Sequence, residues 1–339
     1  MPLQGINLKQ YGSETVSDTS ANGGRISSKE IADSVKNNFW PDVPESERLA
    51  GSDRYRKAFL KVANADGISL RNARIYVDTP TSGDDRVLIF PGTQTNIQDD
   101  ITGSERLYGA GWLEIDAEVE STSISVQVEN ADDFIFRNGD LIVLTDQTNS
   151  SGKYEFVRLA ASDAVIWNGD KATLVFDAGH SLQNAYTASA TRVASVIEAG
   201  DVQAIAEAWD LSSQHGTYDG WDGTGDSPTL ITLDAIGGIE QTWTISFTSP
   251  AAFTCFGDTA GFVGGGSTTG DFSPNNQAFD RPYFTLPASG WGGSWAPGDL
   301  LIFTTHPAAF PIWQRRIVPA GSAAQRGNGM FFGIWGLTA

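Results

Sequence analysis

The chain has little of several residue types on which small stable folds and enzyme active sites often depend. Cys255 is its one cysteine, so no disulfide within the chain can hold the fold, and we expect Cys255 to be a small core residue. Three histidines, His180, His215 and His306, lie far apart, and none stands in a metal-binding spacing such as H-E-x-x-H. No Gly-x-Ser-x-Gly nucleophile motif occurs. These absences exclude a disulfide scaffold and leave no recognisable metal or nucleophile motif.

Long apolar runs are also missing. No segment approaches the roughly 18 apolar residues that a membrane-crossing helix needs, and the polar N-terminus does not follow the pattern of a signal peptide. We therefore expect a protein that is made and kept soluble, without insertion into a membrane.

Basic residues are scarce beyond the first hundred positions. No Lys or Arg occurs between Arg192 and Arg281, and the whole chain has a formal net charge of −19. Such an acidic surface repels phosphate, so we expect no binding to nucleic acid.

Short apolar runs that alternate with polar residues dominate the sequence. With 37 glycines and 40% hydrophobic residues, the composition is typical of a globular protein rich in strands and turns. The main predicted strands are Arg56–Val62, Ala73–Asp78, Arg86–Phe90, Trp112–Ala117, Ser123–Val128, Leu141–Thr145, Tyr154–Leu159, Ala172–Phe176, Tyr283–Leu286, Leu300–Thr304, Ile312–Val318 and Asn328–Leu337.

Three helices are also predicted. A capping-box pattern at Ser27 and Glu30, followed by apolar residues at a spacing of four, predicts a helix that ends before Pro41. Residues 43–51, with Pro44 at the start and Gly51 at the end, predict a second short helix. A third is predicted from Asp201 to Trp209.

These elements predict a mainly β protein with two antiparallel β-sandwich or barrel-like domains, a few short helices and an extended N-terminal arm. The expected arm covers residues 1–25, a β domain with short N-terminal helices covers 26–195, and a C-terminal β domain covers 196–339. The arm is expected to lie against its own domain or against a neighbouring subunit.

A local pattern recurs in which an aromatic residue precedes a Gly-Asp turn and an apolar strand. It is found at Phe136–Leu144 and Trp295–Phe303, with a looser copy at Trp167–Asp170. One interpretation is simple turn chemistry, with glycine at positive φ and aspartate bonded to nearby backbone. The other is that two related β modules lie in one chain.

Acidic residues provide the only candidates for metal or acid–base chemistry. Asp219, Asp222 and Asp226 lie in a Gly-rich loop over residues 219–226, which suits Ca²⁺, although the EF-hand order is missing and a solvated loop is the simpler interpretation. Adjacent carboxylates such as Asp84-Asp85 and Asp132-Asp133 are expected to be turn residues, because neighbours on a strand point to opposite faces. We therefore expect no catalytic residues, no cofactor and no enzyme.

Ten tryptophans are the most unusual feature of the composition. Trp221 and Trp291 stand beside Gly and are candidate glycan contacts, whereas burial in a thin β core or a subunit interface is the alternative that we prefer. Phe331, Phe332 and Trp335 near the C-terminus, together with Trp313, form a candidate interface, because a strand at a chain end either joins its own sheet or pairs with a neighbour.

Two stretches carry runs that are similar to one known family. The runs are Tyr55–Asn64, Leu70–Pro80 and Gly83–Asp85 in the first stretch, and Pro282–Pro287, Gly290–Gly293, Thr305–Ala309, Pro311–Trp313 and Arg315–Gly321 in the second. They resemble virion structural proteins encoded in the tail modules of tailed bacteriophages, including Mu-like phages. The middle of the chain carries no such similarity.

The resemblance implies a non-enzymatic component of the tail or baseplate, present in several copies. Its expected partners are copies of itself and other tail or baseplate proteins, and its expected location is the virion after synthesis in the host cytoplasm. The alternative is a tail protein that binds a receptor or a host-surface glycan during adsorption.

Overall fold

The computed structural model describes residues 5–148 and 152–338, and it is built almost entirely of antiparallel strands. Within these residues there is one α-helix, α1 (Glu45–Ala50), and four short 3-10 helices. No helix in this part of the chain is long and apolar enough to cross a membrane. The prediction of a mainly β protein with few short helices is confirmed.

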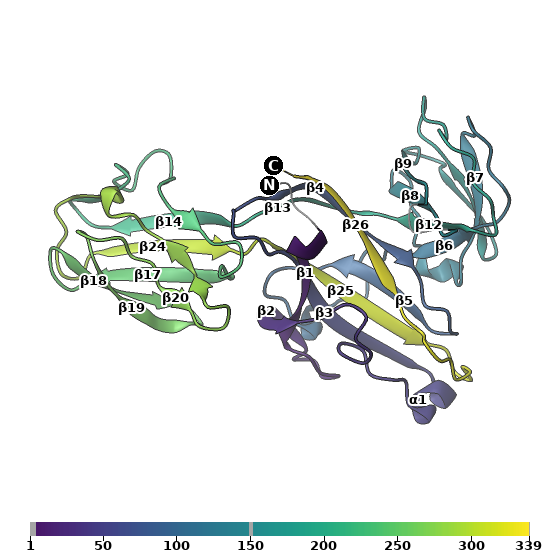
Figure 1. The fold of residues 1–339 in the computed structure, drawn as a ribbon, viewed down its shortest axis with the longest axis horizontal. Coiled ribbons are helices and arrows are strands. Elements are labelled where there is room, and N and C mark those ends of the chain that lie inside the picture. Colours follow the sequence, from purple (N-terminus) through teal and green to yellow (C-terminus); the bar gives the residue numbers. More distant parts are fainter. Residues whose placement is uncertain (1–4, 149–151, 339) are drawn as a thin grey trace.

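A central group of two sheets is made from both ends of the chain, as Figure 1 shows by its purple, blue and yellow strands. The five-stranded sheet contains, in spatial order, β2 (Gly23–Glu30), β1 (Leu8–Thr15), β3 (Ser52–Val62), β25 (Ala309–Val318) and β5 (Arg86–Pro91). The three-stranded sheet contains β13 (Ile197–Val202), β4 (Leu70–Thr79) and β26 (Phe331–Thr338).

The two central sheets pack face to face around a shared apolar core. Leu60 and Ile312 of the larger sheet contact Ile75 and Ile334 of the smaller sheet. Alternation along each strand turns these residues inward, as in a β-sandwich. The core of the central group therefore depends on strands from both ends of the sequence.

The first insertion, residues 92–196, lies between β5 and β13 and forms a closed sheet. Its strands, in spatial order, are β10 (Val165–Asn168), β11 (Lys171–Val175), β7 (Ser123–Gln127), β6 (Ala110–Leu113), β12 (Thr191–Ser195), β8 (Leu141–Asp146) and β9 (Tyr154–Arg158). A bridge between Leu159 and Phe176, at the ends of β9 and β11, closes the sheet on itself. The interior is filled by residues such as Ile142, Leu144 and Leu174, which makes this a packed barrel.

The second insertion, residues 203–308, lies between β13 and β25, on the opposite side of the central group (Figure 1). Its main sheet contains β14 (Ile205–Ser212), β24 (Leu300–His306), β17 (Gln241–Phe247), β18 (Ala252–Gly257) and β19 (Gly261–Ser267). Three short pairs complete it: β15 (Gly216–Tyr218) with β23 (Trp291–Gly293), β16 (Thr232–Leu233) with β22 (Phe284–Thr285), and β20 (Asn275–Asn276) with β21 (Arg281–Pro282). An aromatic core lies between the main sheet and these short pairs.

The N-terminal segment, as far as it is described, lies against its own domain, which is one of the two expected alternatives, and it does so as two strands. Strand β1 pairs with β3 from Leu8 opposite Val62 to Gly12 opposite Ala58, and β2 pairs with β1. The arm is thus part of the five-stranded sheet, because the backbone groups of β1 complete the ladder of β3. Residues 1–4 of the expected arm lie outside the described residues.

The predicted helix over residues 27–39 is also wrong. Ser27 and Glu30 lie in strand β2, and the chain then continues through turns to α1. Val35, which the helix would have buried, is exposed. A capping pattern alone does not stabilise a short helix when its apolar side chains are not buried against the rest of the protein. The short helix predicted over residues 43–51 is confirmed as α1.

The third predicted helix, Asp201 to Trp209, consists instead of the end of β13 and most of β14. Strand β14 pairs with β24, and the ladder shifts register between Glu207 and Asp210, where Ala208 has φ of 54°. This bulge interrupts the two-residue alternation of the strand, so that the apolar positions imitate a helical spacing.

The sheets do not follow the expected division between residues 195 and 196. Strand β25 pairs with β3 and β5, and β26 pairs with β4. The last segment of the chain therefore belongs to the same sheets as the first hundred residues.

The recurring Gly-Asp pattern is one turn used twice. Oδ2 of Asp140 accepts a hydrogen bond from the backbone nitrogen of Arg137 at 2.7 Å, and Oδ2 of Asp299 accepts one from Ala296 at 2.9 Å. Gly139 and Gly298 have φ of 77° and 95°. The strands that follow have different neighbours, since β8 pairs with β9 and β12 whereas β24 pairs with β14 and β17. This difference favours turn chemistry over a duplicated module.

Candidate functional site

The C-terminal strand β26 is an open, uncharged edge of the three-stranded sheet. It pairs with β4 along one side, and no other strand among the described residues pairs with its second side. Its sequence, F-F-G-I-W-G-L-T, has no charged residue and no proline. Phe331 is 61% exposed and Leu337 is 51% exposed. Natural edge strands usually carry charges or proline that prevent pairing, so an edge without them is suited to accept another strand.

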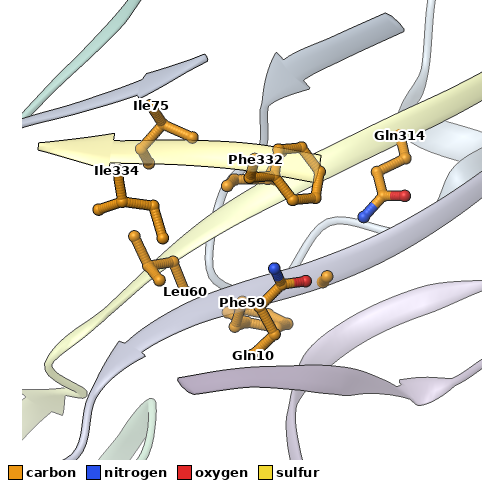
Figure 2. Close-up of a pocket in the computed structure, with 9 residues that line it drawn as sticks. Gln10, Phe59, Leu60, Ile75, Gln314, Phe332 and Ile334 are labelled. Atoms are coloured by element: carbon orange, nitrogen blue, oxygen red, sulfur yellow. The ribbon is translucent and has the colours of Figure 1, made fainter. Parts of the chain in front are cut away.

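The inward face of β26 borders an apolar groove between the two central sheets (Figure 2). Phe332 and Ile334 form one wall, and Leu60 and Ile312 lie across from them. Gln10 and Gln314 supply the polar atoms of the lining. The residues that line the groove include no ionisable group, and their side chains nearly fill it.

The outward face of β26 is tied to the first insertion by aromatic and cationic groups. The guanidinium of Arg74 lies 4.5 Å from the ring centroid of Trp335 and 4.5 Å from that of Phe156 in β9. Gly333 lies under the ring of Tyr76, where a Cβ atom would come within 2.1 Å of Cζ. Trp335 is half-buried by these contacts. Strand β26 can pack against Tyr76 only because residue 333 is a glycine.

A polar latch fixes the point at which β26 begins. Oδ1 of Asn328 accepts hydrogen bonds from the backbone nitrogens of Ser82 and Gly83, at 2.8 and 3.0 Å, and its Nδ2 donates to Asp85. Oδ2 of Asp84 accepts a bond from the backbone nitrogen of Ala323 at 2.7 Å. The Asp84-Asp85 pair thus holds the loop before β26 and has a structural role.

The candidate interface residues do not share one surface. Phe331, Phe332 and Trp335 lie on β26, but Trp313 is fully buried in the middle of the five-stranded sheet. Its ring stacks on Phe90 with centroids 6.3 Å apart. Trp313 is therefore unavailable to a partner, and its assignment to an interface is corrected to a core role.

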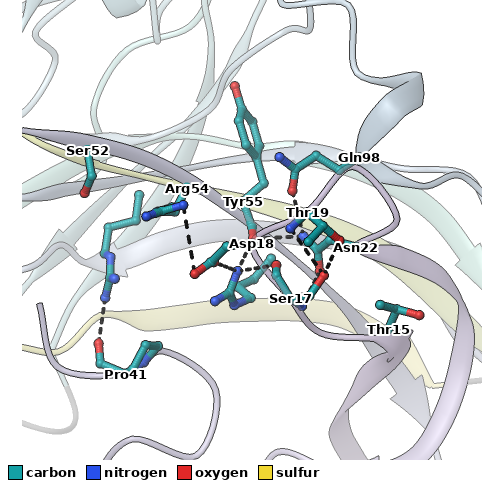
Figure 3. A network of polar contacts seen from close by, with 12 residues as sticks. Thr15, Ser17, Asp18, Thr19, Asn22, Pro41, Ser52, Arg54, Tyr55 and Gln98 are labelled. Atoms are coloured by element: carbon teal, nitrogen blue, oxygen red, sulfur yellow. Dashed lines mark hydrogen bonds and ion pairs between the residues drawn. The ribbon is translucent and has the colours of Figure 1, made fainter. Parts of the chain in front are cut away.

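Three arginines of the five-stranded sheet, Arg54, Arg56 and Arg316, contact the segments on either side of β2. Asp18 lies between Arg54 and Arg56, with its Oδ1 atom 2.6 Å from Nη1 of Arg56 (Figure 3). Trp40 is covered by the guanidinium groups of Arg56 and Arg316, at 5.0 and 4.5 Å from its ring. This network anchors both the turn between β1 and β2, which contains Asp18, and the segment after β2, which contains Trp40, against the sheet.

Two buried lysines were not foreseen from the sequence. Nζ of Lys57 donates to the backbone oxygens of Gly24 and Asn96, at 2.7 and 2.9 Å. Nζ of Lys61 donates to the backbone oxygens of Ile236 and Gly238 in the second insertion. Burial lowers the pKa of each lysine to about 7. The sequence does contain one indication of their burial. Lys57 and Lys61 each lie two residues from Phe59, and alternate residues of a strand share a face.

The candidate glycan contacts belong to the core of the second insertion. Trp221 is only 7% exposed, and Trp291 is half-buried among Tyr218, Phe253 and Trp295. A ring that stacks on a sugar must present a free face to solvent. The burial of Trp221 contradicts an exposed stacking ring at that position, whereas Trp291 packs against the core and remains partly exposed.

The acidic loop uses its carboxylates to hold its own backbone. Oδ2 of Asp219 accepts bonds from the backbone nitrogens of Thr229 and Leu230, at 2.9 and 3.0 Å. Oδ1 of Asp222 accepts bonds from Thr224. Within residues 5–148 and 152–338, no three His, Cys, Asp or Glu side chains gather as ligands for a metal ion.

A second hollow lies where the first insertion meets β5. Arg86 donates to both carboxylate oxygens of Asp133, through Nε at 2.6 Å and Nη2 at 3.3 Å. Glu129 lines the same hollow and is exposed. The bidentate pair neutralises Arg86 and joins β5 to the first insertion, which is a structural role.

Comparison of the chain with protein-family models, with curated proteins and with solved structures found no match.

Proposed function

We propose that this chain is a non-enzymatic structural component of a bacteriophage virion, in the tail or baseplate, and that it acts through protein–protein assembly. The proposal starts from the expected resemblance of its N- and C-terminal stretches to tail-module virion proteins, for which the comparisons gave no match. It places the chain in the virion after synthesis in the host cytoplasm, with copies of itself and other tail or baseplate proteins as partners.

The observation that carries the proposal is the open edge of β26. A neighbouring subunit that adds a strand there satisfies the free backbone groups and covers Phe331 and Leu337. Strand β2 is also an edge of its sheet, but it carries Arg25, Lys29 and Glu30, whereas β26 has no charged residue.

Adsorption to a host glycan through Trp221 and Trp291 is the weaker alternative. Trp221 is buried in the apolar core of the second insertion, and Trp291 packs against that core and is only partly exposed. The assembly proposal uses side chains that are exposed in the isolated chain.

Placing a lysine on the exposed edge of β26 tests the assembly proposal. Phe331→Lys places a charge on β26 without entering the core, and we expect it to weaken association with sister subunits at least about tenfold. The mass of the purified protein, measured by sedimentation over a range of concentrations, reports the change.

Ile115→Lys is the matched control, since Ile115 is 62% exposed and lies in a loop of the first insertion. This variant should associate like the wild type. A wild-type protein that remains monomeric at every concentration, and that does not enter tail particles when mixed with them, would contradict the proposal.

A further inference from the structure

Two of the outermost strands in the sheets of this molecule have no charged side chain. In the described part of the chain, the outermost strands of five or more residues are β2, β5, β9, β13, β14, β19 and β26. Five of them carry charges that discourage pairing with another chain, for example Arg25 in β2, Arg86 in β5, Glu155 in β9, Glu198 in β13 and Glu207 in β14. Strands β19 and β26 have neither a charged residue nor a proline, so they lack this protection.

Strand β19 is the open edge of the second insertion. It pairs with β18, and no other strand among the described residues pairs with its second side. Its sequence, G-F-V-G-G-G-S, is rich in glycine, which within a strand often marks a place where another backbone approaches closely. Phe262 is 61% exposed, and its ring lies 5.3 Å from that of Phe256, which is also exposed. β19 therefore offers a free edge beside an exposed aromatic pair.

The edges of β19 and β26 complement each other in length and in the size of their side chains. β26 has eight residues and β19 has seven. β26 consists mainly of large apolar residues, whereas residues 264–266 of β19 are all glycines. Directly opposite residues of paired strands lie about 5 Å apart, and an aromatic side chain on one strand can cover a glycine on the next. Pairing with β26 covers these glycines, and pairing of β19 with a second β19 does not.

The charges around the two edges are also complementary. Strand β4, which pairs with β26, carries Arg71 and Arg74, and Arg71 is exposed opposite Leu337. Residues 203–280, which include β19, contain acidic residues but no Lys or Arg. A contact between β26 and β19 brings these arginines towards an acidic body, whereas a contact between two β26 strands brings arginine towards arginine. The charges thus favour β19 over a second β26.

We propose that β19 of one copy is the strand that pairs with the free edge of β26 in the next copy. This inference rests on the proposed function, because it names the strand that the neighbouring subunit adds. The two strands lie in different bodies of the molecule, the second insertion and the central group (Figure 1). The contact is therefore heterologous, and its repetition builds a ring or a filament rather than a closed dimer.

Mixing two variants that are blocked at opposite edges provides the test. Phe331→Lys blocks β26 and leaves β19 free, whereas Phe262→Lys blocks β19 and leaves β26 free. Each variant alone should associate at least about tenfold more weakly than the wild type. An equimolar mixture should form dimers through the two unblocked edges, and no larger species. Sedimentation of the three samples measures these outcomes.

Two controls accompany the mixing experiment. Ile115→Lys adds an exposed lysine away from both edges and should associate like the wild type. Cys255 is fully buried in β18, the strand next to β19, so its thiol reports on the folding of the second insertion. In Phe262→Lys this thiol should stay unreactive towards a thiol reagent, as it does in the wild type.

Disulfide cross-linking identifies the paired strands without a lysine. Phe262→Cys is mixed with Phe331→Cys or with Leu337→Cys, which lie near opposite ends of β26, and the mixtures are oxidised. Phe262→Cys should cross-link to one of the two, according to the relative direction of the strands. Neither β26 variant should cross-link to itself. Cys255 will not interfere, because it is buried.

The outcomes separate this inference from the proposed function. If Phe331→Lys weakens association and Phe262→Lys does not, or if the β26 cysteines cross-link to each other, β19 is not the partner. The inference is then overturned, while assembly through β26 stands. A mixture of the two lysine variants that remains monomeric also overturns it. A wild-type protein that remains monomeric and does not enter tail particles would contradict the proposed function itself, and this inference with it.

Discussion

Lys57 and Lys61 are the most unusual individual residues of the central group. Each ammonium group is removed from water and is met by backbone oxygens and aromatic rings instead of a carboxylate. Nζ of Lys61 lies 4.1 Å from the ring centroid of Phe279 in the second insertion. Such a site holds a neutral amine more easily than a charged one, which is why burial lowers both pKa values.

We predict that Lys61 makes the protein more stable as the pH rises above neutrality. The unfolded chain keeps the proton up to about pH 10.4, whereas the folded protein releases it above about 7. The unfolded state therefore binds more protons in this interval, and the free energy of unfolding increases with pH. In Lys61→Met this increase should be smaller, as measured by urea denaturation at pH 6.5 and pH 9.

Lys36→Met is the control, because the side chain of Lys36 is 75% exposed. It should show the same rise in unfolding free energy as the wild type. His306, whose pKa is raised by its hydrogen bonds to Glu240 and Glu207, acts in the opposite direction in all three proteins, so its effect cancels from the comparison. Equal rises in the wild type and Lys61→Met would contradict the prediction.

The burial of the two lysines could be predicted in part from the sequence. Phe59 and the two lysines alternate along one strand, so a buried Phe59 implies two lysines on the buried face. What the sequence did not contain is the identity of the groups that meet the lysines, because Gly238 and Phe279 come from another part of the chain. The burial of Trp313 depends in the same way on β25 lying between β3 and β5.

Among the elements, β26 is the one whose placement has the strictest steric requirement. We predict that Gly333→Ala lowers the free energy of unfolding by about 1–3 kcal/mol, because the added methyl group collides with the ring of Tyr76. Release of the C-terminal strand should accompany the loss. Limited proteolysis after residue 330, together with thermal unfolding, measures both effects.

Gly329→Ala is the matched control for this substitution. A Cβ atom at position 329 meets no atom within 4 Å, and the residue lies just before the strand. This variant should unfold and resist proteolysis like the wild type. If the two variants behave alike, the packing of Tyr76 on Gly333 does not hold the strand.

Most strands were predictable because their apolar residues alternate and their ends carry Gly, Pro or Asp. Strand β8, for example, follows a Gly-Asp turn and lies within one residue of its predicted bounds. The two wrong helices failed for physical reasons that lie outside their own segments. β2 is held by its ladder with β1, and β14 is held by β24 across a bulge at Ala208. Pairing of this kind overrides local propensity.

At the scale of the whole molecule, two inserted bodies extend from a central group that needs both chain ends. The order β3, β25, β5 places a strand from the last tenth of the sequence between two strands from the first third. No local pattern indicates this arrangement, because the pairing partners are more than 200 residues apart. For the same reason the sequence suggested two consecutive domains.

We predict that deletion of residues 309–339 destroys the central group and leaves the first insertion folded. Strands β3 and β5 lose their shared neighbour, whereas the barrel keeps its closing bridge and most of its core. Amide hydrogen exchange measures both regions in one sample. Amides of β3 and β5 should become unprotected, while those of β8 and β12 stay protected.

The barrel serves as the internal control of that experiment. Loss of protection in β8 and β12 as well would mean that the first insertion cannot fold without the rest. Retained protection in β3 would mean that β25 is dispensable to the larger sheet.

The position of β25 also has a consequence for biogenesis. A ribosome must polymerise more than 300 residues before the strand that separates β3 from β5 leaves the exit tunnel. Until then β3 and β5 each lack a neighbouring strand on one side, although the residues of both insertions, which follow β5 in the chain, have already been synthesised. Premature termination between His306 and Ala309 therefore yields a polypeptide that contains both insertions but lacks the strand that joins β3 to β5.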